Sequence, residues 1–207
     1  MSESAATIPA YTVEVEADMT ALTALRGRLK TQGDKVAFHD LFAKCAAAAA
    51  LRHPFINASW TEQGIRVHKR AHVGIAAAVD NGLVVPVVRD AGAKSVTAIA
   101  GESAALIAKA RGGTLLPDEM KGGTITVSNL GGFPVSRFTA IINPPESCIL
   151  AIGATMDRPV LEDGELVFKP MVAINASFDH RVIDGAYGAA FLATLKNFIE
   201  DPAMMIC

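Results

Sequence analysis

Apolar and polar positions follow two different periods at the start of this chain. Residues 11–17 (YTVEVEA) alternate apolar with polar or acidic side chains, which is the period of a half-exposed strand. From Asp18, a stripe of leucines recurs at helical spacing and stops before Gly33, so a helix capped by Asp18 is predicted there. We therefore expect a strand followed by a helix, after a loose, flexible lead-in over residues 1–10.

The same two periods predict the remaining elements. Residues 38–51 are apolar over a wide arc and predict a well-buried helix. Amphipathic helices are also predicted over 95–111 and 184–200. The predicted strands are 57–60, 65–68, 71–79, 83–88, 124–128, 147–152, 166–168 and 171–178, and the turn 80–82 (DNG) joins two of them in a hairpin. Without a repeat or a linker, this pattern predicts one α/β domain over 11–207, a mixed β-sheet with helices packed against it.

Composition narrows the possible partners of this domain. The 207 residues are 51% hydrophobic with a mean hydropathy of +0.32, which is enough apolar material for a buried core and excludes intrinsic disorder. The net charge of -2 leaves no basic excess to neutralise a phosphate backbone, so we expect no nucleic-acid partner. No apolar run approaches the roughly 20 residues that span a bilayer, and no secretory signal is evident, so no membrane partner is expected.

Cysteine usage argues against disulfides and metals. Cys45, Cys148 and Cys207 are widely separated, and no spacing of Cys or His typical of a zinc site occurs. A reducing, intracellular compartment is the simplest interpretation, and no metal is expected. The sequence also lacks the glycine-rich nucleotide-binding motifs and the HExxH zinc motif.

The most informative stretch is 177–185 (SFDHRVIDG). An apolar strand runs into Asp179, His180 and Arg181, and Asp184 then opens the last predicted helix. A histidine held at a strand end by neighbouring carboxylates and an arginine has the fixed tautomer and orientation that a general base needs. The alternative is that His180 only packs in the fold and Asp184 only caps the helix.

This string resembles the DHRxxDG signature of the acyltransferase (E2) components of 2-oxoacid dehydrogenase complexes. Other strings resemble further motifs of that family, in the family's order along the chain. They are 57–60 (NASW), 81–90 (NGLVVPVVRD), 124–131 (TITVSNLG), 140–145 (AIINPP) and 149–153 (ILAIG). The resemblance runs from about Ile8 to the end of the chain. Residues 185–192 (GAYGAAFL) are more similar to the acetyl-transferring branch than to the succinyl branch.

The resemblance implies a fold, an activity and a set of site residues. The fold would be that of chloramphenicol acetyltransferase, a trimer with active sites between subunits. The activity would be reversible transfer of an acetyl group between dihydrolipoyl-lysine and coenzyme A. His180 would be the base on the thiol, Ser128 of the facing subunit would stabilise the oxyanion, and Asp184 would support the site. Asn129, Gly131 and Gly132 would let coenzyme A approach the backbone closely, although a tight turn would also explain them.

The family also implies partners and an assembly. Trimers would join through their C-terminal ends into a 24-mer or a 60-mer, which would bury the apolar residues 204–207 (MMIC). The lipoyl domain and the decarboxylase (E1) and dehydrogenase (E3) components would be partners, in the bacterial cytoplasm or the mitochondrial matrix. The lipoyl and peripheral-subunit-binding domains of the family are not in this chain, and its basic N-terminal arm is expected to be truncated before Ile8.

Three alternatives remain open at this point. The chain could be an acetyltransferase of the same fold with another acceptor, such as chloramphenicol. It could be a branched-chain, acetoin-type or succinyl acyltransferase, which differs in its acyl group or complex. It could also be a non-catalytic structural core subunit, but such homologues typically lose the histidine or the serine, and His180, Asp184 and Ser128 are all present here.

Overall fold

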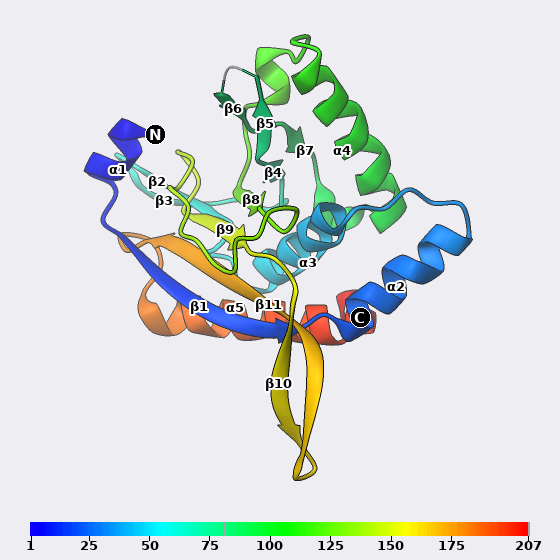
Figure 1. The fold of residues 1–207 in the computed structure, drawn as a ribbon. Helices are drawn as coiled ribbons and strands as arrows, with labels where there is room; N and C mark the ends of the chain where they lie inside the picture. Colours follow the sequence, from blue (N-terminus) through cyan, green and yellow to red (C-terminus); the bar gives the residue numbers. More distant parts are fainter. Residues whose placement is uncertain (81, 207) are drawn as a thin grey trace.

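A mixed sheet forms the centre of the computed structural model, which describes residues 1–80 and 82–206 and, for Ile206, the backbone only. The strand order is β1-β11-β9-β8-β4-β7, and β10 pairs with β11 outside this path (Figure 1). The strands are β1 (Ala10–Asp18), β2 (Ala58–Thr61), β3 (Gly64–Val67), β4 (Val73–Ile75), β5 (Ala77–Val79), β6 (Gly82–Val84), β7 (Val87–Val88), β8 (Ile125–Asn129), β9 (Cys148–Ile152), β10 (Met156–Glu162) and β11 (Glu165–Asp179). The predicted mixed-sheet α/β class is confirmed.

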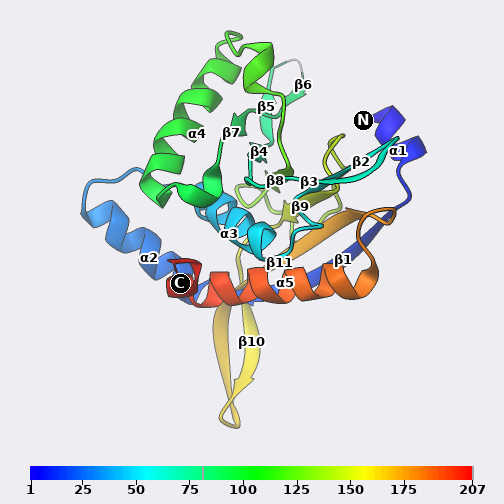
Figure 2. The same cartoon turned by 180° about the vertical axis from the view of Figure 1, so that it is seen from behind.

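Helices cover one face of this sheet, as Figure 2 shows for α3 and α5. The helices are α1 (Ser2–Thr7), α2 (Thr20–Thr31), α3 (Phe38–Arg52), α4 (Val96–Arg111) and α5 (Gly185–Glu200), with 3-10 turns η1 (Ala91–Ala93), η2 (Pro117–Glu119) and η3 (Pro202–Ile206). Alternate strand residues such as Val127, Leu150 and Phe178 join the apolar faces of α3 and α5 in one buried core. The helices predicted over 38–51, 95–111 and 184–200 are therefore confirmed.

Segment 130–147 crosses the opposite, more polar face of the sheet. Ser177 donates a hydrogen bond from its Oγ to the carbonyl oxygen of Ala140 at 2.7 Å. Arg137 forms ion pairs with Glu14 at 2.8 Å and Glu16 at 3.4 Å on β1. The acidic positions of the alternating pattern in β1 therefore face this segment, whereas its apolar positions face α5.

Two predicted strands are interrupted in the structure. The stretches 71–79 and 83–88 form four short strands, with β4 paired to β7 and β5 paired to β6. Pro86 supplies the physical reason, because it has no N–H for a ladder and its carbonyl instead accepts a hydrogen bond from the N–H of Ile75. Asn81 of the predicted turn lies outside the described residues.

The hairpin of β10 and β11 was not predicted as such. The pattern predicts separate strands over 166–168 and 171–178, but β11 is one 15-residue strand, and its first half pairs with β10 on an arm that extends from the body (Figure 1). Leu161 and Phe168 on this arm are 76% and 69% exposed. Because neither face of the arm is buried in this chain, β10 lacks the alternating pattern that marks a half-buried strand.

The lead-in predicted to be loose over residues 1–10 is a short helix instead. α1 places Ser4 in a buried position, where its Oγ donates to the carbonyl oxygen of Ile142 at 2.6 Å. A six-residue helix is not stable from its own propensity, so this contact with segment 130–147 explains its presence. The polar sequence gave no sign of a contact 138 residues away.

Candidate active site

His180 lies at the end of β11, with its side chain exposed. Its N–H donates to the carbonyl oxygen of Pro9 at 3.0 Å. The imidazole packs against the ring of Tyr11, with 4.8 Å between ring centroids and 54° between ring planes. Its ring nitrogen atoms form no hydrogen bond within the described part of the chain, so they are available to a group that approaches from outside.

Asp179 and Arg181 bind each other rather than His180. Asp179 is 2% exposed and accepts from the Arg181 Nε at 2.9 Å and from its Nη2 at 2.7 Å. The guanidinium also lies over Trp60, 5.3 Å from the ring centroid. The expectation that these neighbours orient the imidazole was wrong, because the carboxylate is already fully used by the arginine. The pair instead holds the strand end in place.

Asp184 caps the last helix. Its Oδ1 accepts from the N–H of Tyr187 at 2.9 Å, which satisfies one of the free amides in the first turn of α5. The Asp184 carbonyl oxygen accepts from the Tyr11 hydroxyl at 2.6 Å. Asp184 thus caps the helix, the four-residue spacing brings it and His180 to the same end of the sheet, and its support of the active site remains a prediction.

Ser128 lies near the end of β8, followed by a tight turn. The Oδ1 of Asn129 accepts from the N–H of Gly131 at 2.7 Å, so the turn interpretation of this segment is confirmed. Gly131 and Gly132 are exposed beside it. The structure thus gathers Ser128, Asn129 and the two glycines at one place, and a role of the latter three in binding coenzyme A remains a prediction.

Strand register separates Ser128 from His180 within one chain. Ser128 is level with Ala151 on β9, which in turn is level with Asn175 on β11. His180 follows Asn175 by five residues, which is roughly 16 Å along the strand, and β8 is two strands away from β11. Groups that act on one thioester must lie within about 3–3.5 Å of the reacting atoms. His180 and Ser128 of the same chain therefore cannot serve the same substrate.

The remaining histidines and Cys148 have structural contacts. Cys148 is buried in β9, which raises the pKa of its thiol well above the usual range. Each of the other histidines has a partner within the chain: His39 with Asp40, His53 with Thr194, His68 with Ser59 and His72 with the N–H of Asp90.

Among the described residues, no group of three or more His, Cys, Asp or Glu is placed to hold a metal ion. None of the described helices has the length and apolar character that crossing a membrane requires.

One buried carboxyl group, that of Glu146, is not marked by any sequence motif. Glu146 is 3% exposed, and it accepts from the Thr126 Oγ1 at 2.6 Å and from the Asn143 Nδ2 at 3.2 Å. Burial raises its pKa from 4.5 to about 8, although both hydrogen bonds lower it. The residue follows the AIINPP motif directly, but nothing in its sequence context marks it as buried.

Glu146 predicts a specific dependence of stability on pH. Because its folded pKa lies above the unfolded value of 4.5, the folded state holds the proton more tightly, and this stabilisation is lost as the pH rises toward about 8. We expect thermal unfolding between pH 6 and pH 9 to show a smaller fall in Tm for Glu146→Gln than for the unchanged protein. The exposed control Glu62→Gln should behave like the unchanged protein. Equal slopes for all three proteins would contradict the assignment.

Comparison with known proteins identifies the family. Residues 1–207 match the family described as 2-oxoacid dehydrogenases acyltransferase (catalytic domain). The chain belongs to this family. Two relatives of this acyltransferase domain are dihydrolipoyllysine-residue acetyltransferase components of pyruvate dehydrogenase complexes, from Rickettsia felis and Rhizobium meliloti, 37% and 40% identical over 99% of the chain. The chain spans about half the length of these relatives, 51% and 47%.

Solved structures of the family have the same fold. The acyltransferase domain matches the dihydrolipoamide acetyltransferase of Azotobacter vinelandii with a TM-score of 0.95 and 32% identity, over all of this chain and 87% of that one. It matches the cubic core of a pyruvate dehydrogenase multienzyme complex at 0.94 and 33%, with the same coverage. Chloramphenicol acetyltransferase matches at 0.62 and 18%, over 93% of this chain and 89% of that one, so the predicted chloramphenicol-acetyltransferase-like fold is confirmed.

Proposed function

We propose that this acyltransferase domain transfers an acetyl group reversibly between coenzyme A and a dihydrolipoyl group on a separate domain. The observation that carries the proposal is the placement of His180, exposed at the end of β11 with both ring nitrogens available, in a chain that belongs to the acyltransferase family. The site would be completed by Ser128 of a second copy, because the register keeps Ser128 of the same chain away.

The reaction follows from the chemistry of thiols. A thiol is mostly protonated at neutral pH, and only the thiolate attacks a thioester well. The imidazole of His180 takes the thiol proton as sulfur bonds to the acetyl carbonyl carbon, and the Ser128 hydroxyl donates to the oxygen that becomes negative. The intermediate then expels the other sulfur as thiolate, which receives the proton from His180. One thioester replaces another, so the transfer runs in both directions.

The Azotobacter structure supports these roles. That study concerns a serine, a histidine and an asparagine in the catalytic mechanism of the acetyltransferase; the histidine lies 52 positions after the serine, and the asparagine lies 4 positions after the histidine. The spacings from Ser128 to His180 and from His180 to position 184 are the same. Asp184 differs from the asparagine, but either side chain offers an oxygen that can accept the N–H of Tyr187.

Steady-state assays test the proposed activity. Dihydrolipoamide should accept acetyl from acetyl-CoA faster than it accepts succinyl or isobutyryl groups from the corresponding thioesters. Chloramphenicol should not replace dihydrolipoamide as acceptor. A preference for another acyl group would favour a branched-chain or succinyl acyltransferase, and an absence of turnover with every pair would favour a structural core subunit. An acetoin-type complex is the second candidate, because a relative from the acetoin cleaving system of Bacillus subtilis, 38% identical, is also a dihydrolipoyllysine-residue acetyltransferase component.

We infer that the working form is a homotrimer that joins further trimers into a 24-mer or a 60-mer. The lipoyl domain and the decarboxylase and dehydrogenase components are its proposed partners, in the bacterial cytoplasm or the mitochondrial matrix. Relatives are described from bacterial complexes and from a mitochondrial complex of Arabidopsis thaliana, and one solved structure is a cubic core.

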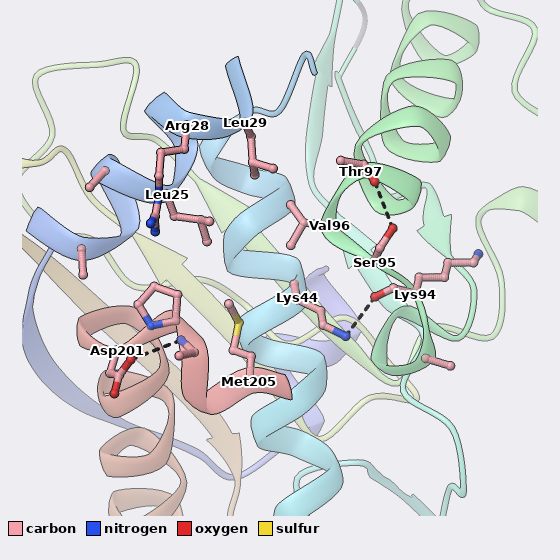
Figure 3. Close-up of a pocket in the computed structure, with 15 residues that line it drawn as sticks. Leu25, Arg28, Leu29, Lys44, Lys94, Ser95, Val96, Thr97, Asp201 and Met205 are labelled. Carbon is pink, nitrogen blue, oxygen red and sulfur yellow. Dashed lines mark hydrogen bonds between the residues drawn. The ribbon is translucent and has the colours of Figure 1, made fainter. Parts of the chain in front are cut away.

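An apolar pocket beside the C-terminal turn supports this assembly. The pocket, of about 970 Å³, lies between α2, α3, the start of α4 and η3 (Figure 3). Leu25, Leu29 and Val96 line it from the helices, and Met205 lines it from η3. Met204, next to it, is 42% exposed. A protruding apolar residue beside an apolar hollow is self-complementary across a twofold axis, so two trimers could bury both.

The structure corrects one expectation about this tail. Residues 204–207 were expected to stay exposed in a single chain, but Met205 packs on the core of its own chain, and its Sδ lies 3.3 Å from the Cys45 Sγ. Met205 is therefore occupied within its own chain, whereas the exposed side chain of Met204 can contact another trimer. The side chain of Ile206 and all of Cys207 lie outside the described residues.

Removal of the tail should separate the trimers. Deletion of residues 203–207, or the single change Met204→Asp, is expected to yield free trimers in size-exclusion chromatography with light scattering, because the contact loses its apolar residue or must bury a charge. Leu116→Asp is the control, because this leucine is 60% exposed, more than Met204, and does not line the pocket; the change should leave the large particle intact. A large shell formed by both tail variants would contradict this assembly.

A further inference from the structure

The contacts around His180 come from one short segment at the start of the chain. Pro9 accepts the backbone N–H of His180 at 3.0 Å, and two residues later the ring of Tyr11 packs against the imidazole at 4.8 Å between centroids. The Tyr11 hydroxyl then donates to the carbonyl oxygen of Asp184 at 2.6 Å. Segment 9–11 therefore contacts the backbone and the ring of His180 and the beginning of α5.

We infer that Tyr11 is a positioning residue for the proposed reaction: its aromatic ring fixes the imidazole of His180 in the orientation that proton transfer requires. This inference rests on the proposed function of His180. Within the described chain, the imidazole has no hydrogen bond that sets its orientation, and the nearby carboxylate of Asp179 is occupied by Arg181. The tyrosine ring packs on the imidazole and thereby restricts its rotation about the side-chain bonds.

Tyr11 itself is held firmly enough to act in this way. Its backbone pairs with Phe178 in the β1–β11 ladder, and its ring also packs against the Phe178 ring, with 5.5 Å between centroids. The short bond to the Asp184 carbonyl fixes the far end of the ring. Burial, with the negative charge of Asp184 as a further cause, raises the pKa of the Tyr11 hydroxyl to about 12, so the hydroxyl remains protonated and keeps donating at physiological pH.

The ring and the hydroxyl of Tyr11 have separable roles. The ring contacts the imidazole, whereas the hydroxyl ties β1 to the start of α5. Tyr11→Phe keeps the ring and loses only the hydroxyl bond. Tyr11→Leu keeps an apolar side chain but removes both the flat ring and the hydroxyl. A misplacement of about 1 Å in a reacting group can lower the rate about 100-fold, so loss of the ring should be visible in turnover.

The test compares these two variants in acetyl transfer from acetyl-CoA to dihydrolipoamide, using the assembled particle. Tyr11→Leu should lower kcat about tenfold or more and leave KM for both substrates within about twofold, whereas Tyr11→Phe should stay within about threefold of the unchanged kcat. Val13→Ala, an apolar neighbour on the same face of β1, controls for general weakening of the strand and should keep kcat. Size-exclusion chromatography and Tm report whether each variant remains folded and assembled.

Two outcomes would overturn the inference. One is an unchanged kcat in Tyr11→Leu. The other is an equal loss of kcat in Tyr11→Phe and Tyr11→Leu, which would assign the effect to the hydroxyl. A Tyr11→Leu variant that fails to fold would be replaced by Tyr11→Met and Tyr11→His, of which only the histidine variant, with its flat ring, should retain most of kcat. His180→Ala separates this result from the proposed function: if its turnover is lost while Tyr11→Leu remains active, only the role of Tyr11 fails.

Discussion

His180→Ala is expected to lower kcat for acetyl transfer by about 10²- to 10⁴-fold, the usual contribution of a positioned general base. Without the imidazole, the thiol must lose its proton to water, and the departing thiolate finds no proton donor. The variant should remain folded and assembled, because the His180 side chain is exposed and only its backbone N–H is used in a hydrogen bond. Tm and particle size should therefore match those of the unchanged protein.

Two measurements support the interpretation of His180→Ala. At a pH well above the pKa of the substrate thiol, the thiolate forms without help, so the deficit of the variant should become smaller. His39→Ala is a control for loss of a histidine elsewhere, since His39 pairs with Asp40 at the start of α3. Turnover at the unchanged level in His180→Ala would remove this residue from the mechanism.

Ser128→Ala is expected to lower kcat by about 10²- to 10³-fold, which is the usual effect of removing one donor to an oxyanion. The hydroxyl donates to an oxygen that carries negative charge only as the transition state is approached, so KM should change little. Ser128→Thr keeps a hydroxyl at the same position and should retain much more activity than the alanine variant. An alanine variant with unchanged kcat would exclude Ser128 as the oxyanion donor.

The fold could be predicted from the sequence wherever one face of an element is buried. Residues 38–51, 95–111 and 184–200 each have one apolar stripe, and each forms the predicted helix, because the stripe faces the core. The pattern failed where burial is absent or depends on a remote contact. The arm containing β10 has no buried face, and α1 depends on a hydrogen bond from Ser4 to the distant Ile142.

The site could be predicted only as far as its residues lie close together in the sequence. His180 and Asp184 share one string, and Ser128 shares another with Asn129. The sequence places Tyr11 on a strand but indicates no role for it, because it lies 169 positions before His180 and the pairing of β1 with β11 brings the two together. The distance between Ser128 and His180 likewise depends on register across three strands, which local periodicity does not specify.

The proposed active site combines His180 of one copy with Ser128 of another. The most direct test mixes chains that carry His180→Ala with chains that carry Ser128→Ala, co-expressed in equal amounts and purified through a different tag on each. Each variant alone should have at most about 1% of the unchanged activity. A Ser128→Ala chain keeps its histidine, and a His180→Ala chain keeps its serine. If the chains mix at random in a closed oligomer, about a quarter of the sites should combine an intact histidine with an intact serine and be active. Mixed particles as inactive as the two parents would contradict a site shared between copies.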